Sequence, residues 1–111
     1  MTQERRIIVA SDAGILIRSF ADISNALGKC LGSGGLILTE SDLAPGFFEL
    51  RSGLAGELFQ KFINYNVRVA LIVPNPKVYG ERFAELAHEH ESHNLIRFVH
   101  SAAEAKAWLF S

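Results

Sequence analysis

The chain has 111 residues, of which 49% are hydrophobic, and a formal net charge of -1 at pH 7. This length predicts a single domain, residues 1–111, with its own core, and the near-neutral charge argues against nucleic acid as a main partner, which would require a basic face. No apolar run reaches the roughly 20 residues of a membrane span, and the N-terminus lacks a secretory leader, so we expect a cytoplasmic protein without a membrane partner.

The first elements in chain order are predicted to be a hairpin, a helix and a strand. Residues 6–10 and 15–18 are short β-type runs that flank the turn-forming cluster Ser-Asp-Ala-Gly, so they predict two antiparallel strands. Ser19, with Asp22 three residues later, is typical of a helix N-terminus. The apolar spacing predicts a helix over residues 20–31, which ends at the glycine-rich residues 32–35. Residues 36–39 then predict a buried strand.

Cys30 is the only cysteine of the chain. It therefore excludes an intrachain disulfide and fits a reducing compartment. Cys30 lies in register with Ile23 and Leu27 on the apolar side of its predicted helix, so we expect a buried small hydrophobe and not a reactive thiol.

The second half of the chain alternates helices and strands. Strands are predicted at residues 67–73 and 95–99, with a helix between them over residues 79–91. Ser101 and Glu104 predict a capping box for a closing helix. Strands that alternate with helices require parallel neighbours and right-handed crossovers. The predicted fold class is therefore α/β, with the order β-β-α-β-α-β-α-β-α and a mixed, mostly parallel sheet flanked by helices.

The run from Phe47 to Tyr65 is the most informative part of the chain. Gly53 and Gly56 lie in the expected first turn of a helix, where each glycine costs about 1 kcal/mol relative to alanine. We therefore expect one of them to lie too close to a strand backbone or a bound anion to accommodate a Cβ.

Pro45 and Gly46 predict a turn that sends one of Phe47 and Phe48 into the core and leaves the other exposed, beside Tyr65 or another apolar neighbour. An exposed aromatic patch is typical of an interface, so we expect a homodimer or a protein partner there.

The order of elements resembles the STAS-type domain of anti-sigma-factor antagonists and sulfate-transporter tails. In that family a hairpin is followed by alternating helices and strands, and the antagonists carry Asp-Ser-Ser-Gly-Leu at the start of a helix. The second serine of that motif is the regulatory phosphorylation site. The corresponding run here is Leu50-Arg51-Ser52-Gly53-Leu54, whose last three residues match and whose first two do not. The resemblance implies a regulatory protein-interaction module with Ser52 at its docking surface.

A second resemblance rests on the motif Phe-Phe-x-Leu-basic-Ser/Thr-Gly-Leu-Ala-Gly-Glu-x-x-Gln-Lys-Phe-x-Asn-Tyr-x-Val. The chain carries every element of it between Phe47 and Val67. This motif resembles the hallmark of a bacterial family known only as domain of unknown function 4180. The resemblance implies a bacterial protein but no particular activity.

Ligands of open α/β sheets gather outside the carboxyl ends of the strands. The connections expected there carry the candidate residues Glu40, Ser41, Asp42, Arg51, Ser52, Asn75 and Lys77, together with His100 after the last predicted strand. A helix N-terminus at Ser52 and Gly53, with Arg51 beside it, suits an anion or a phosphate. The alternative is that Ser52 only caps the helix and that the glycines let the helix lie close to the sheet.

No catalytic site, metal site or cofactor can be assigned. His88 and His90 are two residues apart on a predicted helix and cannot converge on one ion, and no zinc-type ligand spacing is present. The chain has no nucleophile elbow, phosphate loop or dinucleotide fingerprint. We therefore expect a non-enzymatic regulatory or interaction module; the alternative is a small-ligand or anion-binding domain, and an enzyme is the least favoured class.

Overall fold

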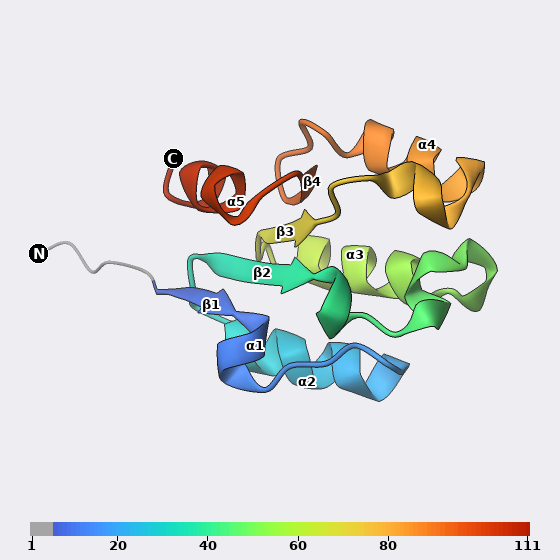
Figure 1. The fold of residues 1–111 in the computed structure, drawn as a ribbon. Coiled ribbons are helices and arrows are strands. Elements are labelled where there is room, and N and C mark those ends of the chain that lie inside the picture. Colours follow the sequence, from blue (N-terminus) through green and yellow to red (C-terminus); the bar gives the residue numbers. More distant parts are fainter. Residues whose placement is uncertain (1–5) are drawn as a thin grey trace, which may run out of the picture.

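Four strands form one parallel sheet in the computed structural model, which describes residues 6–111 (Figure 1). The strands lie in the spatial order of the sequence, and every neighbouring pair is parallel: β1 (Ile7–Val9), β2 (Gly35–Thr39), β3 (Val69–Ile72) and β4 (Ile96–Val99). Five α-helices accompany them: α1 (Ala10–Ala13), α2 (Phe20–Cys30), α3 (Leu54–Asn64), α4 (Glu81–Glu89) and α5 (Ala102–Leu109). Within these residues, none of the helices is both long and apolar enough to cross a bilayer.

The two faces of the sheet bury separate hydrophobic clusters, because successive side chains of a strand point to opposite faces. The larger cluster packs α2, α3 and α4 against one face, which includes Leu36, Leu38 and Val69. The smaller cluster packs Ala105, Trp108 and Leu109 of α5 against the other face, which includes Ile37, Ala70 and Val99. The chain is therefore an α/β domain with three long helices on one side of the sheet and one on the other.

The predicted N-terminal hairpin is wrong. Residues 10–13 form the single helical turn α1, which ends at Gly14 with φ 70° and a bond from its amide to the Ala10 carbonyl. This hydrogen bond closes a helical turn in place of the predicted reversal of the chain. Residues 15–18 form no strand of the sheet; instead Ile17 makes an isolated parallel bridge to Leu43. The sheet is consequently all-parallel and not mixed.

The predicted helix starts are confirmed where a serine caps the helix. The Ser19 side chain accepts a hydrogen bond from the Asp22 amide at the start of α2. The Ser101 side chain accepts one from the Glu104 amide at the start of α5. Cys30 is buried, as expected, and burial raises the pKa of its thiol to about 11, so it stays protonated near neutral pH.

The prediction that Gly53 or Gly56 lies too close to a strand backbone for a Cβ is wrong. A Cβ built on Gly56 would have no neighbour within 4 Å, and one on Gly53 would lie 3.5 Å from the Phe20 ring, an ordinary contact. Gly53 instead adopts φ 81° as the N-cap of α3, a left-handed conformation that favours glycine. A glycine with little room for a side chain is Gly35 in β2, which has φ 141° and where a Cβ would lie 2.6 Å from Leu109 Cδ2 and 3.1 Å from the Arg68 carbonyl oxygen.

We predict that alanine at the two positions changes stability in opposite directions. Gly56→Ala should raise the free energy of unfolding by up to about 1 kcal/mol, because alanine is the better helix former and the added methyl group meets nothing. Gly53→Ala should lower it by about 1–2 kcal/mol, because alanine is strained in the left-handed region. Urea unfolding of the two single variants measures both changes, and a destabilised Gly56→Ala would contradict this account.

Candidate functional site

The candidate residues Glu40 to Ser52, Asn75 and Lys77 lie in the connections that follow the carboxyl ends of β2 and β3. Three short 3₁₀ helices, η1 (Glu40–Asp42), η2 (Pro45–Phe48) and η3 (Leu50–Ser52), join β2 to α3. A fourth, η4 (Pro76–Tyr79), joins β3 to α4 and is preceded by Asn75. The candidate site is thus built from two loop systems that meet at one edge of the sheet.

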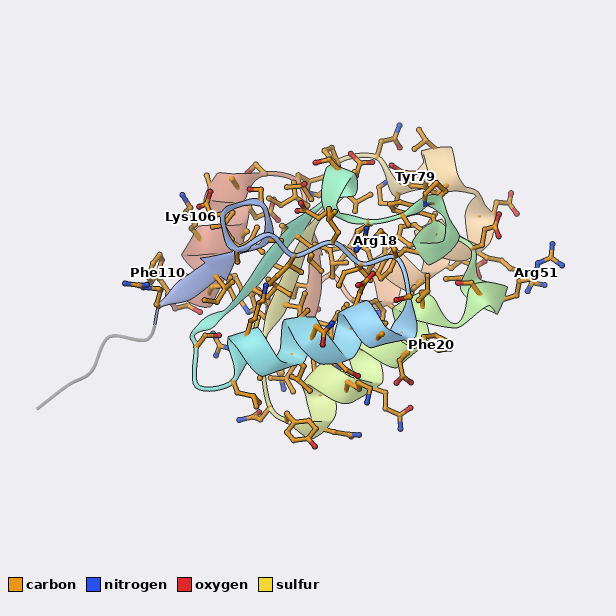
Figure 2. All side chains as sticks on the ribbon, turned by 90° about the horizontal axis from the view of Figure 1, so that it is seen from below. Arg18, Phe20, Arg51, Tyr79, Lys106 and Phe110 are labelled. Atoms are coloured by element: carbon orange, nitrogen blue, oxygen red, sulfur yellow. The ribbon has the colours of Figure 1, made fainter. Side chains whose placement is uncertain are left out.

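Ser52 lies at the N-terminus of α3 and is exposed. Its hydroxyl donates a 2.6 Å hydrogen bond to the Gly46 carbonyl and accepts one of 3.2 Å from the Leu54 amide, two residues on, as predicted. Ser52 therefore links η2 to the first turn of α3. Its neighbour Arg51 is also exposed and extends into solvent at this end of the molecule (Figure 2).

Phe20 was not identified as a site residue from the sequence. The apolar spacing of residues 20–31 predicted a helix with one buried side, yet 54% of the surface of Phe20 is exposed. Phe20 is the first residue of α2, and its ring lies against Gly53 at the neighbouring helix N-terminus. Its exposure depends on how far the start of α2 extends beyond the edge of the sheet. The spacing of apolar residues along the helix does not encode this position. We use the name Ser52 surface for Phe20, Arg51, Ser52, Gly53 and Gly56.

The predicted exposed patch at Phe47 and Phe48 is not present. Phe47 is fully buried, which confirms that one of the two rings enters the core. Phe48 is half-buried and stacks on Tyr79, with ring centroids 3.7 Å apart. It does not lie in the open beside Tyr65, which is at the opposite end of α3 and 60% exposed. The two phenylalanines thus hold the loops together and offer little surface to a partner.

A carboxylate–phenol hydrogen bond joins the same two loop systems. Tyr79 of η4 donates its hydroxyl hydrogen to Glu40 of η1. The hydrogen bond to the Glu40 carboxylate, followed by burial and the negative charge itself, raises the pKa of Tyr79 to about 12. The phenol therefore stays protonated near neutral pH and acts as a donor, not as a base or nucleophile.

The other polar candidates are engaged in local structure or stand apart. Asp42 is only 5% exposed and accepts hydrogen bonds from the Thr39 amide and hydroxyl. Asn75 and Lys77 are exposed, and in residues 6–111 no side-chain hydrogen bond or ion pair joins either of them to Ser52. At the carboxyl edge of the sheet, Glu40 and Tyr79 are therefore in contact. The candidate residues predicted from the sequence do not all gather around one binding site.

A hollow of about 560 Å³ lies between η3 and the start of α4. Phe48, Tyr79 and Phe83 contribute its aromatic part. Both signs of charge are present among its lining residues, which are Phe48, Glu49, Leu50, Arg51, Tyr79, Gly80, Glu81, Arg82 and Phe83. This mixture suits a surface for polar and aromatic contacts and gives no strong preference for an anion.

His90 and His93 take part in hydrogen bonds within the fold. In the described part of the chain, no group of three His, Cys, Asp or Glu residues could hold an ion. His90 Nδ1 instead donates to the Leu86 carbonyl. His93 Nδ1 accepts hydrogen bonds from the Leu95 and Ile96 amides, at 3.0 and 3.1 Å. Burial, and then the charges of His90 and Arg97, lower the pKa of His93 below its ordinary 6.5.

We predict that Tyr79→Phe lowers the free energy of unfolding by about 1 kcal/mol, the usual contribution of one hydrogen bond, because the stack on Phe48 is kept while the bond to Glu40 is lost. Chemical denaturation measures the change. A double-mutant cycle with Glu40→Gln provides the control: additive effects of the two substitutions would show that the bond contributes nothing.

We also predict that the protein loses stability as the pH falls below about 6.5. The folded state holds His93 neutral, because Nδ1 accepts two amides, whereas the unfolded chain binds the proton at its ordinary pKa. The stabilisation is therefore complete above the unfolded pKa and is lost below it. Thermal unfolding between pH 5 and 8 should show a weaker pH dependence for His93→Asn, which keeps an acceptor oxygen. The exposed His88→Asn is the matched control, and an equal effect of both variants would contradict the prediction.

Comparison with known proteins agrees with one of the two resemblances. The family model described as Domain of unknown function (DUF4180) matches residues 2–109, nearly the whole chain. No curated protein and no solved structure matches the chain significantly. The resemblance to STAS-type domains is therefore not supported by a similar solved structure. The chain belongs to the DUF4180 family.

Proposed function

We propose that the chain is a non-enzymatic protein-interaction module of the regulatory, anti-sigma-factor-antagonist type, which binds a protein partner through the Ser52 surface. The observation that carries this proposal is the exposed Phe20 ring resting on Gly53, directly beside the exposed Ser52 and Arg51. An exposed aromatic ring flanked by an arginine is the composition enriched in the energetic centres of protein interfaces.

Gly56 supports an external contact at the same surface. It is exposed, has no positive φ and leaves open space where a side chain would stand. Nothing within residues 6–111 accounts for a glycine that costs the helix about 1 kcal/mol. A partner that approaches the first turn of α3 closely would account for it, because a Cβ at this position would hold the partner's backbone away.

The surrounding titratable groups support a binding role more than a chemical one. Tyr79 is held protonated by Glu40, and Asp42 is committed to the Thr39 amide and hydroxyl. General acid–base catalysis requires a group that can exchange a proton near the working pH. Neither residue is arranged to supply one beside Ser52.

The antagonist-type part of the proposal rests on the position of Ser52-Gly53-Leu54 at the start of α3, in a chain of successive strand–helix units. Three features depart from the antagonist pattern: residues 6–111 form no hairpin, Leu50 replaces the aspartate of the motif, and Arg51 replaces its first serine. The resemblance therefore suggests the kind of regulation and leaves the partner to be identified.

Phosphorylation of Ser52 would change this surface without entering the core. A phosphoryl group on Oγ would replace the hydrogen that Ser52 donates to the Gly46 carbonyl. It would add a charge of about -1.5 to -2 next to Arg51, at a helix N-terminus that favours negative charge by about 0.3–1 kcal/mol. The fold would tolerate the modification while the charge presented to a partner is inverted.

The second candidate function is the binding of a small anion at the N-terminus of α3. The free space above Gly56 favours it, since an anion could reach the first amides of the helix there. A ligand of this kind would need no protein partner. It should bind the isolated chain, and Phe20→Ala should leave that binding unchanged.

We predict that Phe20→Ala and Ser52→Asp each weaken binding to the partner that co-purifies with the native chain, by about tenfold or more. The partner should be identified by affinity purification and then titrated, as a pure protein, with each variant. Ser52→Ala should bind the partner but lose about 1 kcal/mol of stability, because it removes the hydrogen bonds that the hydroxyl makes with the Gly46 carbonyl and the Leu54 amide.

Tyr65→Ala is the matched control, because Tyr65 is an exposed aromatic residue at the other end of α3. It should bind as the native chain does. Sedimentation of the chain alone shows whether the partner is a second copy, in which case Phe20→Ala should shift a homodimer to monomer. If Phe20→Ala and Ser52→Asp bind every partner like the native chain, the Ser52 surface is not the docking site.

A further inference from the structure

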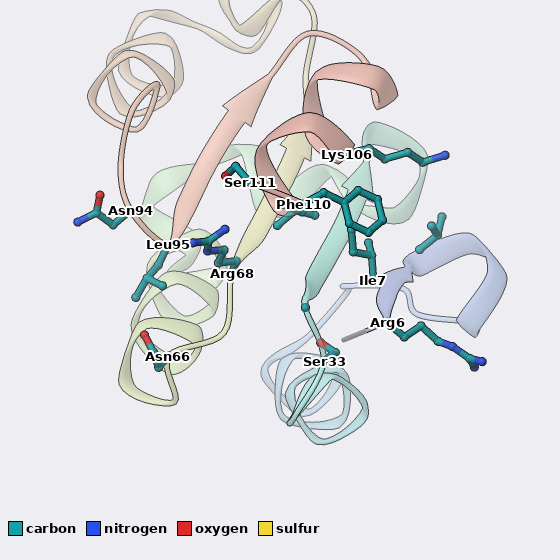
Figure 3. A pocket seen from close by; sticks show the side chains of 13 residues that line it. Arg6, Ile7, Ser33, Asn66, Arg68, Asn94, Leu95, Lys106, Phe110 and Ser111 are labelled. Carbon is teal, nitrogen blue, oxygen red and sulfur yellow. The ribbon is translucent and has the colours of Figure 1, made fainter. Parts of the chain in front are cut away.

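A second cavity, of about 1110 Å³, lies at the amino edge of the sheet (Figure 3). Its lining residues Lys106 and Phe110 lie at the other end of the molecule from Arg51 (Figure 2). The cavity lies between the starts of the strands and the C-terminal end of α5. Its lining residues are Arg6, Ile7, Val9, Ser33, Gly34, Asn66, Arg68, Asn94, Leu95, Lys106, Leu109, Phe110 and Ser111. Its volume is slightly above the roughly 300–1,000 Å³ of small-molecule sites, so it is larger than a bare inorganic ion requires.

Among residues 6–111, the charged side chains that line this cavity are all positive. They are Arg6, Arg68 and Lys106, and no Asp or Glu side chain of these residues lines it. Among residues 6–111, no carboxylate forms an ion pair with any of these three cations. Positive side chains that gather without a paired carboxylate side chain from residues 6–111 raise the local concentration of anions. The lining charge therefore favours an anionic ligand.

Arg68 is positioned for such a ligand by the indole of Trp108. Its guanidinium carbon lies 5.6 Å from the centre of that ring, and Nη1 donates a 3.4 Å hydrogen bond to the Trp108 carbonyl. An arginine carries five N–H donors, so most of them remain free. Arg6 and Lys106 stand on the rim, are exposed, and extend into solvent (Figure 3). Their long, flexible stems can fold over a ligand that Arg68 holds.

The remaining lining groups suit an organic molecule. Phe110 is 71% exposed and its ring stands over the cavity beside Ile7 (Figure 3). Asn66 and Asn94 add amide donors and acceptors. We propose that this cavity binds an organic phosphate, with its phosphate groups on Arg68, Lys106 and Arg6 and its apolar or aromatic part against Phe110. The proposal is independent of the Ser52 surface, which lies at the other edge.

Trp108 is the only tryptophan and reports on this cavity directly, because Arg68 lies against it. The chain of residues 1–111 should be titrated with ADP, adenosine and inorganic pyrophosphate, following Trp108 emission and, in parallel, the heat of binding. We expect saturable binding of ADP, weaker binding of pyrophosphate, and no binding of adenosine over the same range. No saturable response to ADP, or adenosine or pyrophosphate binding as tightly as ADP, would overturn the proposal.

Arginine and lysine variants test the location of the site by calorimetry. Arg68→Gln and Lys106→Gln should each weaken ADP binding, by about tenfold for Arg68. Lys106 is exposed and its side chain makes no hydrogen bond or ion pair within residues 6–111, so its variant tests the site even if Arg68→Gln disturbs the contact with Trp108. Arg82→Gln, at the opposite edge, is the matched control and should bind like the native chain. An equal loss in Arg82→Gln would show nonspecific attraction and overturn the proposal.

Discussion

Each strand of the sheet pairs in parallel with the strand that follows it in the sequence, and this pairing determines where the helices lie. A parallel pair needs a crossover, and crossovers are right-handed, so α2, α3 and α4 are all placed on one face. Only α5, which follows the last strand, packs against the other face. The same rule brings the starts of α2 and α3 to one edge, which is why Phe20 meets Gly53 although the two are far apart in sequence.

The connection from β2 to α3 would be a loose loop without its contacts to the next connection. Phe47 is anchored in the core, Phe48 stacks on Tyr79, and Tyr79 donates to Glu40. These contacts tie η1 and η2 to η4 and so hold the chain that leads into Ser52. A protein surface held in this way loses little entropy on binding. The aromatic residues thus support the proposed docking surface from beneath and do not form it.

Helix starts and strand positions could be predicted from the sequence, because they depend on residues that are close together in the chain. Ser19 and Ser101 cap their helices as their spacing indicated, and the strands from residue 36 onward lie where the apolar runs placed them. The hairpin failed because the cluster ending at Gly14 can close a helical turn as well as reverse the chain. The exposure of Phe20 and the cavity beside Trp108 depend on how distant elements pack together, which no local pattern encodes. The requirement for glycine at position 35 is likewise hidden from the sequence, because it depends on the packing of Leu109 from the last helix against β2.

The central claim is that partners bind at the N-terminus of α3. Amide hydrogen exchange of the chain, free and in complex with its identified partner, tests this claim most directly. The account predicts that the complex protects residues 46–60 and the start of α2, while amides of α4, α5 and the amino edge exchange as in the free chain. Protection confined to α5 or to the amino edge, with residues 46–60 unchanged, would contradict it.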